Sequence, residues 1–208
     1  MENQAAMENE PLIDEPLKRA LSALYQAPDR QYHNLAHIET MLALARHYRA
    51  SLHDPGAVEA AIWFHDAIYD SRTKDNEARS AALAEEKLAD RTDPERLGRV
   101  ATMIVATATH ELPSLQRLGD EHFIRDAALF LDMDLSILGA APEAFDAYEQ
   151  AVRREYQWVE EPMWRAGRSA VLKNFLARPH IYHTEEFRQR FEPQARRNMA
   201  RSIAALEP

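Results

Sequence analysis

Apolar residues recur at spacings of three and four along most of the chain, and the strict alternation of apolar and polar positions that is typical of strands is hard to find. This pattern predicts an all-α fold, a bundle of about nine helices. Prolines and the few glycines fall where the apolar stripes break, as expected for helix ends. The predicted helices cover residues 14–26, 35–50, 55–69, 74–90, 94–110, 120–139, 142–158, 162–177 and 184–205.

The organisation along the chain is simple. No shift in composition marks a second domain, so we expect one helical domain over residues 13–208. Residues 1–12 have no periodic apolar face and predict a flexible tail. The N-terminus is acidic and polar, unlike a signal peptide, and no apolar run approaches the ~20 residues of a membrane span. We therefore expect a cytoplasmic protein that does not contact membranes.

The composition limits the chemistry that the chain can support. The absence of cysteine excludes disulfides, thiolate metal sites and cysteine nucleophiles. Nine histidines and 34 acidic residues remain as ligands, and imidazole with carboxylate oxygen suits manganese, iron, cobalt, zinc, nickel or magnesium. Five scattered glycines do not make a phosphate-binding loop, and no GxSxG motif is present. Any chemistry is therefore expected from side chains on helix faces.

The charge balance bears on the partners. The 25 basic residues are outnumbered by 34 acidic ones, which gives a formal charge of −9. Such a charge argues against binding a nucleic-acid backbone over an extended surface. A small substrate is the more natural partner, and the oligomeric state is not predicted.

The stretch YHNLAHIETM places His33 and His37 four residues apart, close to one helical turn. If a helix begins near Asn34, both imidazoles can face one site. A lone histidine on an apolar face is more often a packed core residue, so this stretch gains weight only from the others.

The stretch AIWFHDAIYD places His65 at the end of an apolar stripe that includes Ile62, with Asp66 at the edge of that stripe. An ionised carboxylate beside a core is costly unless it is paired or bound to a metal. A neutral histidine next to it makes a plausible pair of ligands for one cation. A His-Asp dipeptide alone is common by chance.

The stretch FLDMDLSILG places Asp134 on an otherwise apolar helical face, where it needs a strong partner. Asp132 points to a different face and is expected to be a surface or helix-end charge, although it remains an alternative ligand. In MIVATATH, an apolar face leads to His110 at the end of a predicted helix. His110 is therefore either a helix C-terminal charge partner or a further ligand.

The order H…HD…D, present here as His37, His65 with Asp66, and Asp134, resembles the signature of the HD superfamily of helical metal phosphohydrolases. YHNLAH resembles the YHNxxH motif of class I cyclic-nucleotide phosphodiesterases, ATATH resembles their TDMxxH segment, and MDLS resembles their ADLS. Ala108 replaces the aspartate of TDMxxH and the chain is much shorter than those catalytic domains, so cyclic-nucleotide specificity is not implied.

A wider resemblance, over roughly residues 28–205, is to small bacterial HD-domain proteins that are predicted metal-dependent phosphohydrolases. The blocks RQYHNLAH, WFHDAIYD, DNEARSA, LDMDLSILG, RREY and ARRN occur here in the order that is typical of that group. Several motifs in one order are much harder to obtain by chance than any single motif.

The resemblance implies an HD-domain helical bundle and a site with defined roles. A divalent metal would be held by His37, His65, Asp66 and Asp134, and His33 would be the general acid that protonates the leaving group. The implied reaction is hydrolysis of a phosphate ester, a small phosphometabolite or nucleotide, by a metal-activated water. His110 would reach a second metal or the substrate.

Two further groups of residues are candidates around such a site. Asn76 and Glu77 begin the predicted helix that follows the HD stretch, and they either form a solvated, capped first turn or orient a ligand histidine or a water on the metal. Arg30, Arg153 and Arg168 are candidates for phosphate binding, because arginine can grip phosphate oxygens with two nitrogens. A surface or interhelical salt bridge is the commoner role of such arginines.

Two other functions remain open from the sequence. One is a di-iron oxygenase on the same HD scaffold, for which more histidine ligands would be expected. The other is a regulatory module that binds metal through the HD residues and has no turnover. The intact set of candidate ligands favours an enzyme.

Overall fold

The structure, a computed structural model, describes residues 11–207, and within this range it is all-α, as the sequence predicts. Ten α-helices and two 3₁₀ helices are present among these residues. Their bounds are α2 (Glu15–Leu24), α3 (Leu35–His47), η1 (Arg49–Ser51), α4 (Pro55–Phe64), α5 (Asn76–Leu88), α6 (Pro94–Ala106), α7 (Leu115–Leu118), α8 (Glu121–Asp134), η2 (Leu135–Gly139), α9 (Pro142–Glu155), α10 (Glu161–Leu176) and α11 (Glu185–Leu206).

Each of the nine predicted helices corresponds to an observed one, and the differences lie at helix ends. The short α7 was not predicted. The helix predicted over 55–69 ends at Phe64, and the one predicted over 120–139 is α-helical only to Asp134 and then continues as the 3₁₀ helix η2. In both places side chains that are distant in sequence donate hydrogen bonds to backbone carbonyls just beyond the α-helix. The helix ends therefore depend on tertiary contacts, which the apolar period of the sequence does not reveal.

The chain divides into two compact units, one ending at Met133 and the other starting at Asp134, and each is described here by itself. The single domain expected from the composition therefore stays a prediction. Of the expected tail, residues 1–10 lie outside the described residues, and Leu12 is buried rather than part of a loose segment. No helix in the part of the chain that the structure describes has the length and apolar character needed to cross a membrane.

In the first unit, α4 is the central element. Nine of its ten residues are buried, and it contacts α2, α3, α5 and α6. Asp54 caps its N-terminus by accepting the Ala57 N–H at 2.8 Å, and Pro55 occupies the first turn, where a missing N–H costs nothing. Apolar burial on all sides leaves the two ends of α4 as the places where polar groups must be satisfied by other side chains.

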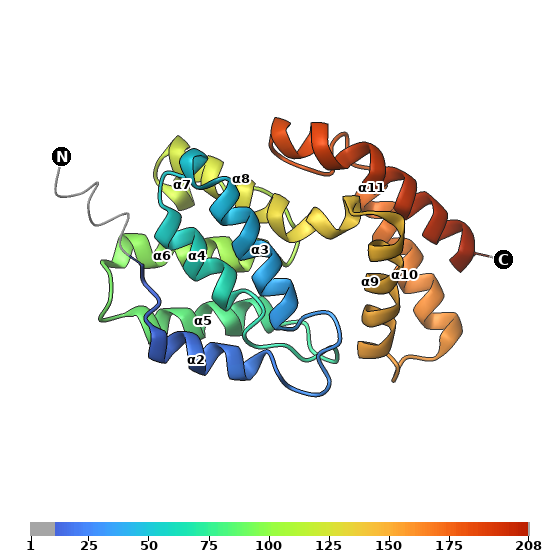
Figure 1. Cartoon of the computed structure of the whole chain (residues 1–208), viewed down its shortest axis with the longest axis horizontal. Helices are drawn as coiled ribbons and strands as arrows, with labels where there is room; N and C mark the ends of the chain where they lie inside the picture. Colours follow the sequence, from blue (N-terminus) through green and yellow to red (C-terminus); the bar gives the residue numbers. More distant parts are fainter. Residues whose placement is uncertain (1–10, 208) are drawn as a thin grey trace. The chain divides into compact units, whose positions relative to one another are not determined.

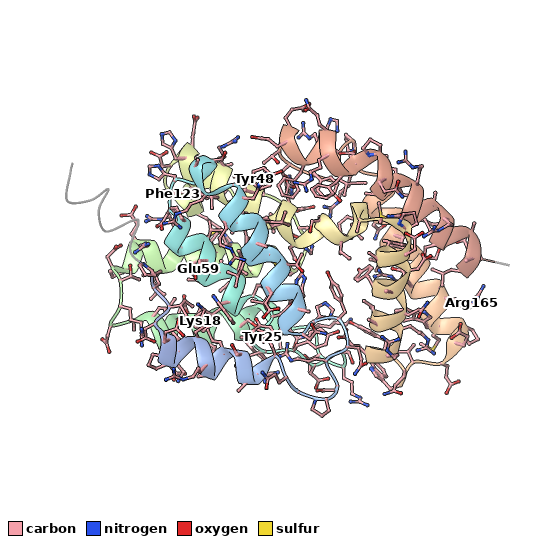
Figure 2. The ribbon with its side chains drawn as sticks, viewed as in Figure 1. Lys18, Tyr25, Tyr48, Glu59, Phe123 and Arg165 are labelled. Atoms are coloured by element: carbon pink, nitrogen blue, oxygen red, sulfur yellow. The ribbon has the colours of Figure 1, made fainter. Side chains whose placement is uncertain are left out.

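A buried network of acids and arginines surrounds the N-terminal end of α4. Arg96 donates from Nε and Nη2 to the two carboxylate oxygens of Asp54, both at 2.8 Å, and Arg99 lies 3.6 Å from the same carboxylate. The Arg99 guanidinium also lies 3.8 Å from the ring centroid of Phe123, which is labelled in Figure 2. Asp126 accepts the backbone N–H groups of His53 and Asp54 at 2.8 and 2.7 Å. Burial raises the pKa of Asp126, and the two N–H groups oppose that shift.

In the second unit, α11 packs against both η2 and α10, and α10 and α11 can be followed side by side in Figure 1. Asn198 of α11 donates to the carbonyls of Leu138 and Ala140, both at 2.9 Å, and the Tyr182 hydroxyl donates to the Leu135 carbonyl at 3.1 Å. A Cβ added to Gly139 would lie 2.6 Å from the carbonyl oxygen of Phe191, so glycine permits this close approach of η2 to α11.

The first prediction concerns the buried network. Arg96→Met removes the bidentate partner of Asp54 and leaves a buried carboxylate poorly compensated, so we expect the free energy of unfolding to fall by about 3–5 kcal/mol. Urea denaturation measures this loss. Arg79→Met is the matched control, because Arg79 is exposed and its ion pair with Asp75 is long, at 4.0 Å. This variant should change the free energy of unfolding by less than ~0.5 kcal/mol. Equal losses in the two variants would contradict the importance of the network.

The second prediction compares two glycines of the second unit. Gly139→Ala should lower the free energy of unfolding by about 1–3 kcal/mol, because its methyl group overlaps the backbone of Phe191. Gly167→Ala in α10 meets nothing within 4 Å and should raise stability by roughly 0.5–1 kcal/mol through its better helix propensity. Urea denaturation of both variants checks the opposite signs, and a gain in Gly139→Ala would refute the close approach.

Candidate metal centre

His65 is the residue that directly follows α4, and its imidazole is oriented by the last turn of that helix. The side chain is 1% exposed, and Nδ1 lies 2.9 Å from the carbonyl oxygen of Ile62. Because a carbonyl can only accept, Nδ1 must carry the proton in this contact, and Nε2 is then the nitrogen through which the neutral ring could bind a metal. A ligand histidine is typically fixed by such a hydrogen bond to a carbonyl.

His37 comes from the first turn of α3. That helix begins where the Asn34 side chain accepts the Ala36 N–H at 2.9 Å, so Asn34 is the N-cap. His37 is buried, and its Nδ1 lies 3.2 Å from the Tyr32 hydroxyl. Its Nε2 lies 3.3 Å from Nε2 of His65, so both rings are held through Nδ1 and direct Nε2 to the same point.

Asp66 lies beside this pair of imidazoles. Its Oδ2 is 3.1 Å from Nε2 of His65 and 3.9 Å from Nε2 of His37, and its side chain is 16% exposed. Burial by itself raises the pKa of the Asp66 carboxyl, but the positive charge of the neighbouring protonated imidazoles, His65 first, and a hydrogen bond from His65 hold it well below its usual value. Asp66 is therefore a carboxylate and not a carboxylic acid at neutral pH.

Asp134 is the last residue of α8, and the division into units falls directly before it, at the end of that helix. One oxygen of Asp134 and one nitrogen each of His37 and His65 lie within 4.8 Å of one another. These three residues form a group that could hold a metal ion, and it is the one such group of three or more acidic or histidine ligands found among the described residues.

The donor set fits a divalent cation of intermediate hardness. Two nitrogen ligands about 2.0–2.1 Å from a tetrahedral ion lie about 3.3 Å apart, which matches the 3.3 Å between the two Nε2 atoms. Imidazole nitrogen with carboxylate oxygen suits zinc, iron, manganese or cobalt and does not select among them. The arrangement therefore supports binding of a metal, and its identity is not fixed by these ligands.

His33 lies next to this centre without being one of its three grouped ligands. Its ring stacks on Tyr69 with centroids 4.2 Å apart and planes 26° apart, and it is 6.5 Å from the His37 ring centroid. The ring is half-buried, and it influences the Asp66 carboxylate electrostatically. A histidine at this distance can act on a bound molecule instead of on the metal.

Of the two residues predicted to orient ligands, Asn76 connects the start of α5 to the preceding loop by hydrogen bonds. Asn76 accepts the Asp70 N–H at 3.1 Å and the Thr73 hydroxyl at 2.9 Å, and it donates to the Asp70 carbonyl at 3.0 Å. Its side chain therefore orders the loop that follows the HD stretch. Glu77 is half-buried in the first turn of α5, and the structure assigns it no hydrogen bond or ion pair among the described residues. A role for either residue in orienting a ligand stays a prediction.

The remaining candidates make other contacts. Arg153 pairs with Glu161 at 3.1 Å and donates to the carbonyl of Tyr156, while Arg168 pairs with Glu149 and donates to the Tyr148 hydroxyl at 2.7 Å. Both arginines thus link α9 to the next helix, the alternative that the sequence left open.

Helix α6 ends at Ala106, so His110 lies four residues beyond it, and His110 has a positive φ of 52°. It does not belong to the three-ligand group, and a second metal stays a prediction.

Several important residues near the centre were missed or misread from the sequence. Asp132 was expected at the surface, but it is fully buried at 0% exposure within α8. The Ser80 hydroxyl accepts the Ile68 N–H at 3.0 Å, a contact that the sequence did not predict, although Ser80 follows Asn76 by one helical turn on the same face. Tyr32 and Tyr69 lie inside YHNLAH and WFHDAIYD, but no role for either was predicted from the sequence.

None of the protein-family models, curated proteins or solved structures compared with this chain matches it. Membership of the HD superfamily therefore rests on the motifs alone and is a proposal.

The third prediction tests the centre as a metal site. His65→Ala removes one of two converging nitrogens, so purified protein should lose bound divalent metal, while the helical circular-dichroism spectrum is retained. His47→Ala is the control, because His47 is exposed, its ring contacts that of Tyr48, and it is not in the three-ligand group. Metal analysis after dialysis against Mn²⁺ or Zn²⁺ compares the two. Equal metal content in both variants would remove His65 from the ligand set.

Proposed function

We propose that this chain is a metal-dependent phosphohydrolase of the HD type, which holds a divalent cation through His37, His65, Asp66 and Asp134. The observation that carries the proposal is the pair of buried imidazoles whose Nε2 atoms face each other at 3.3 Å beside an ionised carboxylate. Imidazole nitrogen and carboxylate oxygen are usual ligands of divalent cations, and one cation at this point would be within reach of several of them.

Held by these residues, a divalent cation would supply Lewis-acid chemistry, namely an activated water and a polarised phosphoryl oxygen. The chain's own residues would supply the ligands of the cation and the proton for the leaving oxygen. His33 stacks on Tyr69 beside the centre and has the chemistry to protonate a leaving oxygen. Asp66, whose Oδ2 lies 3.1 Å from Nε2 of His65, would add a carboxylate to the ligands of the cation.

The substrate class follows from the chemistry of the centre and the charge of the chain. Attack of water on phosphorus suits a phosphate ester, and the formal charge of −9 disfavours long polyanions in comparison with a small phosphorylated molecule. A di-iron oxygenase would need more histidine ligands than the two in the described group. A regulatory module would bind metal equally well, and turnover is what separates it from the enzyme.

The fourth prediction is that substitutions of the two histidines of YHNLAH have different effects on metal binding and on hydrolysis. His37→Ala should lose the metal and nearly all hydrolysis. His33→Ala should keep the metal and lose ~10²–10⁴-fold in rate on an alkyl phosphate ester, the range typical of general acid catalysis. That loss should shrink on a nitrophenyl ester, because a leaving oxygen of low pKa needs little protonation.

The test measures rates on both esters and metal content on the same samples of the wild type and the two variants. An equal rate loss on both esters, or metal loss in His33→Ala, would show that His33 is not the acid. A wild type that retains metal but hydrolyses neither these esters nor a panel of phosphorylated metabolites would favour the regulatory module.

A further inference from the structure

Arg30 is a buried cation without an acidic partner. It lies in the segment between α2 and α3 and is 8% exposed, and it forms no ion pair with any residue that the structure describes. Burying a charge without compensation is expensive, so its contacts must supply the missing stabilisation. The sequence offers Arg30 as a phosphate ligand, and its surroundings point to a different use.

The guanidinium binds backbone carbonyls on two separate segments. Nη1 donates to the carbonyl of His33 at 2.9 Å and to that of Asp66 at 2.7 Å, and Nη2 donates to the carbonyl of Ala67 at 2.9 Å. The last two carbonyls lie just beyond the C-terminal end of α4, where helix carbonyls lack intrahelical partners and a positive charge is favourable. One side chain thus ties the YHN segment to the HD turn.

Aromatic rings complete the surroundings of the guanidinium. Its Cζ lies 5.0 Å from the ring centroid of Tyr25 and 5.5 Å from that of Tyr69, distances at which a cation is attracted to a ring. Tyr25, labelled in Figure 2 just past the end of α2, is itself fixed because its hydroxyl donates to the Trp63 carbonyl at 2.9 Å. Tyr69 is the ring on which His33 stacks. Arg30 therefore contacts the backbone of His33 directly and its imidazole through Tyr69.

We propose that Arg30 is a positioning residue that sets the distance between His33 and the metal ligands by binding the carbonyls of His33, Asp66 and Ala67. This inference rests on the proposed function for its effect on turnover. Its effect on metal affinity requires only that the centre binds metal. Lysine cannot replace it, because an ammonium group lacks the planar fork whose two terminal nitrogens reach the three carbonyls.

The test uses the full chain with Arg30→Lys and Arg30→Met. We expect both variants to bind Mn²⁺ ~10–100-fold more weakly, the range typical of residues that support metal ligands. Turnover number on the nitrophenyl ester should fall at saturating metal, with a smaller change in KM. Hydrogen exchange measured by mass spectrometry should rise over 31–36 and 64–70.

Arg196→Lys and Arg196→Met are the matched controls. In the second unit, Arg196 also donates to three backbone carbonyls, those of Leu176, Arg178 and Pro179, and its other partner is Glu192. These variants should lose thermal stability yet bind Mn²⁺ within about twofold of the wild type, because a general loss of stability does not reposition ligands.

Each outcome bears on the proposal. Wild-type affinity, turnover and exchange in Arg30→Lys would overturn it, and so would equal loss of metal affinity in the Arg196 variants. If Arg30→Met does not fold, Arg30→Lys decides, since it keeps the charge and the aliphatic stem. A wild type that binds metal without hydrolysis removes the proposed function, while metal affinity and exchange still test the positioning role. If no metal binds, the exchange measurement alone decides.

Discussion

The burial of α4 on all sides is the constraint on which the first unit depends. A helix buried in this way has backbone N–H and C=O groups at its two ends that lack intrahelical partners and have little access to water. The sequence resolves this differently at each end. At the N-terminus, Asp54 caps the helix and is neutralised by Arg96 and Arg99. Just beyond the C-terminal end of the helix, Arg30 binds the carbonyls of Asp66 and Ala67. His65 and Asp66 are the two residues that directly follow the helix.

This arrangement explains why reactive groups occur where they do. The buried imidazole of His65 directly follows α4, and its Nδ1 lies 2.9 Å from the carbonyl oxygen of Ile62. Nδ1 of His37, in α3, lies 3.2 Å from the Tyr32 hydroxyl, and the Nε2 atoms of the two rings lie 3.3 Å apart. A group that could hold a cation thus lies at helix ends, which restrict ligand motion more than loops do.

The helices themselves were predictable because the apolar period and the prolines are local features of the sequence. The candidate ligands were predictable because His37, His65 and Asp134 interrupt apolar stripes, where a polar residue needs a special reason. The burial of Asp132 was not predictable, since the apolar pattern marks one buried face of a helix and does not show that a second face is buried as well. The role of Arg30 was equally hidden, because its three acceptors are backbone carbonyls, which have no signature in the sequence.

The central claim is that His37 and His65 bind one divalent cation together through Nε2. X-ray absorption spectroscopy of the protein loaded with one equivalent of Zn²⁺ tests it most directly, because imidazole rings give a distinctive multiple-scattering pattern. We expect a shell of nitrogen and oxygen ligands at about 2.0–2.1 Å with scattering from two imidazoles. A shell of oxygen alone, or scattering from a single imidazole, would show that the two histidines do not bind one cation together.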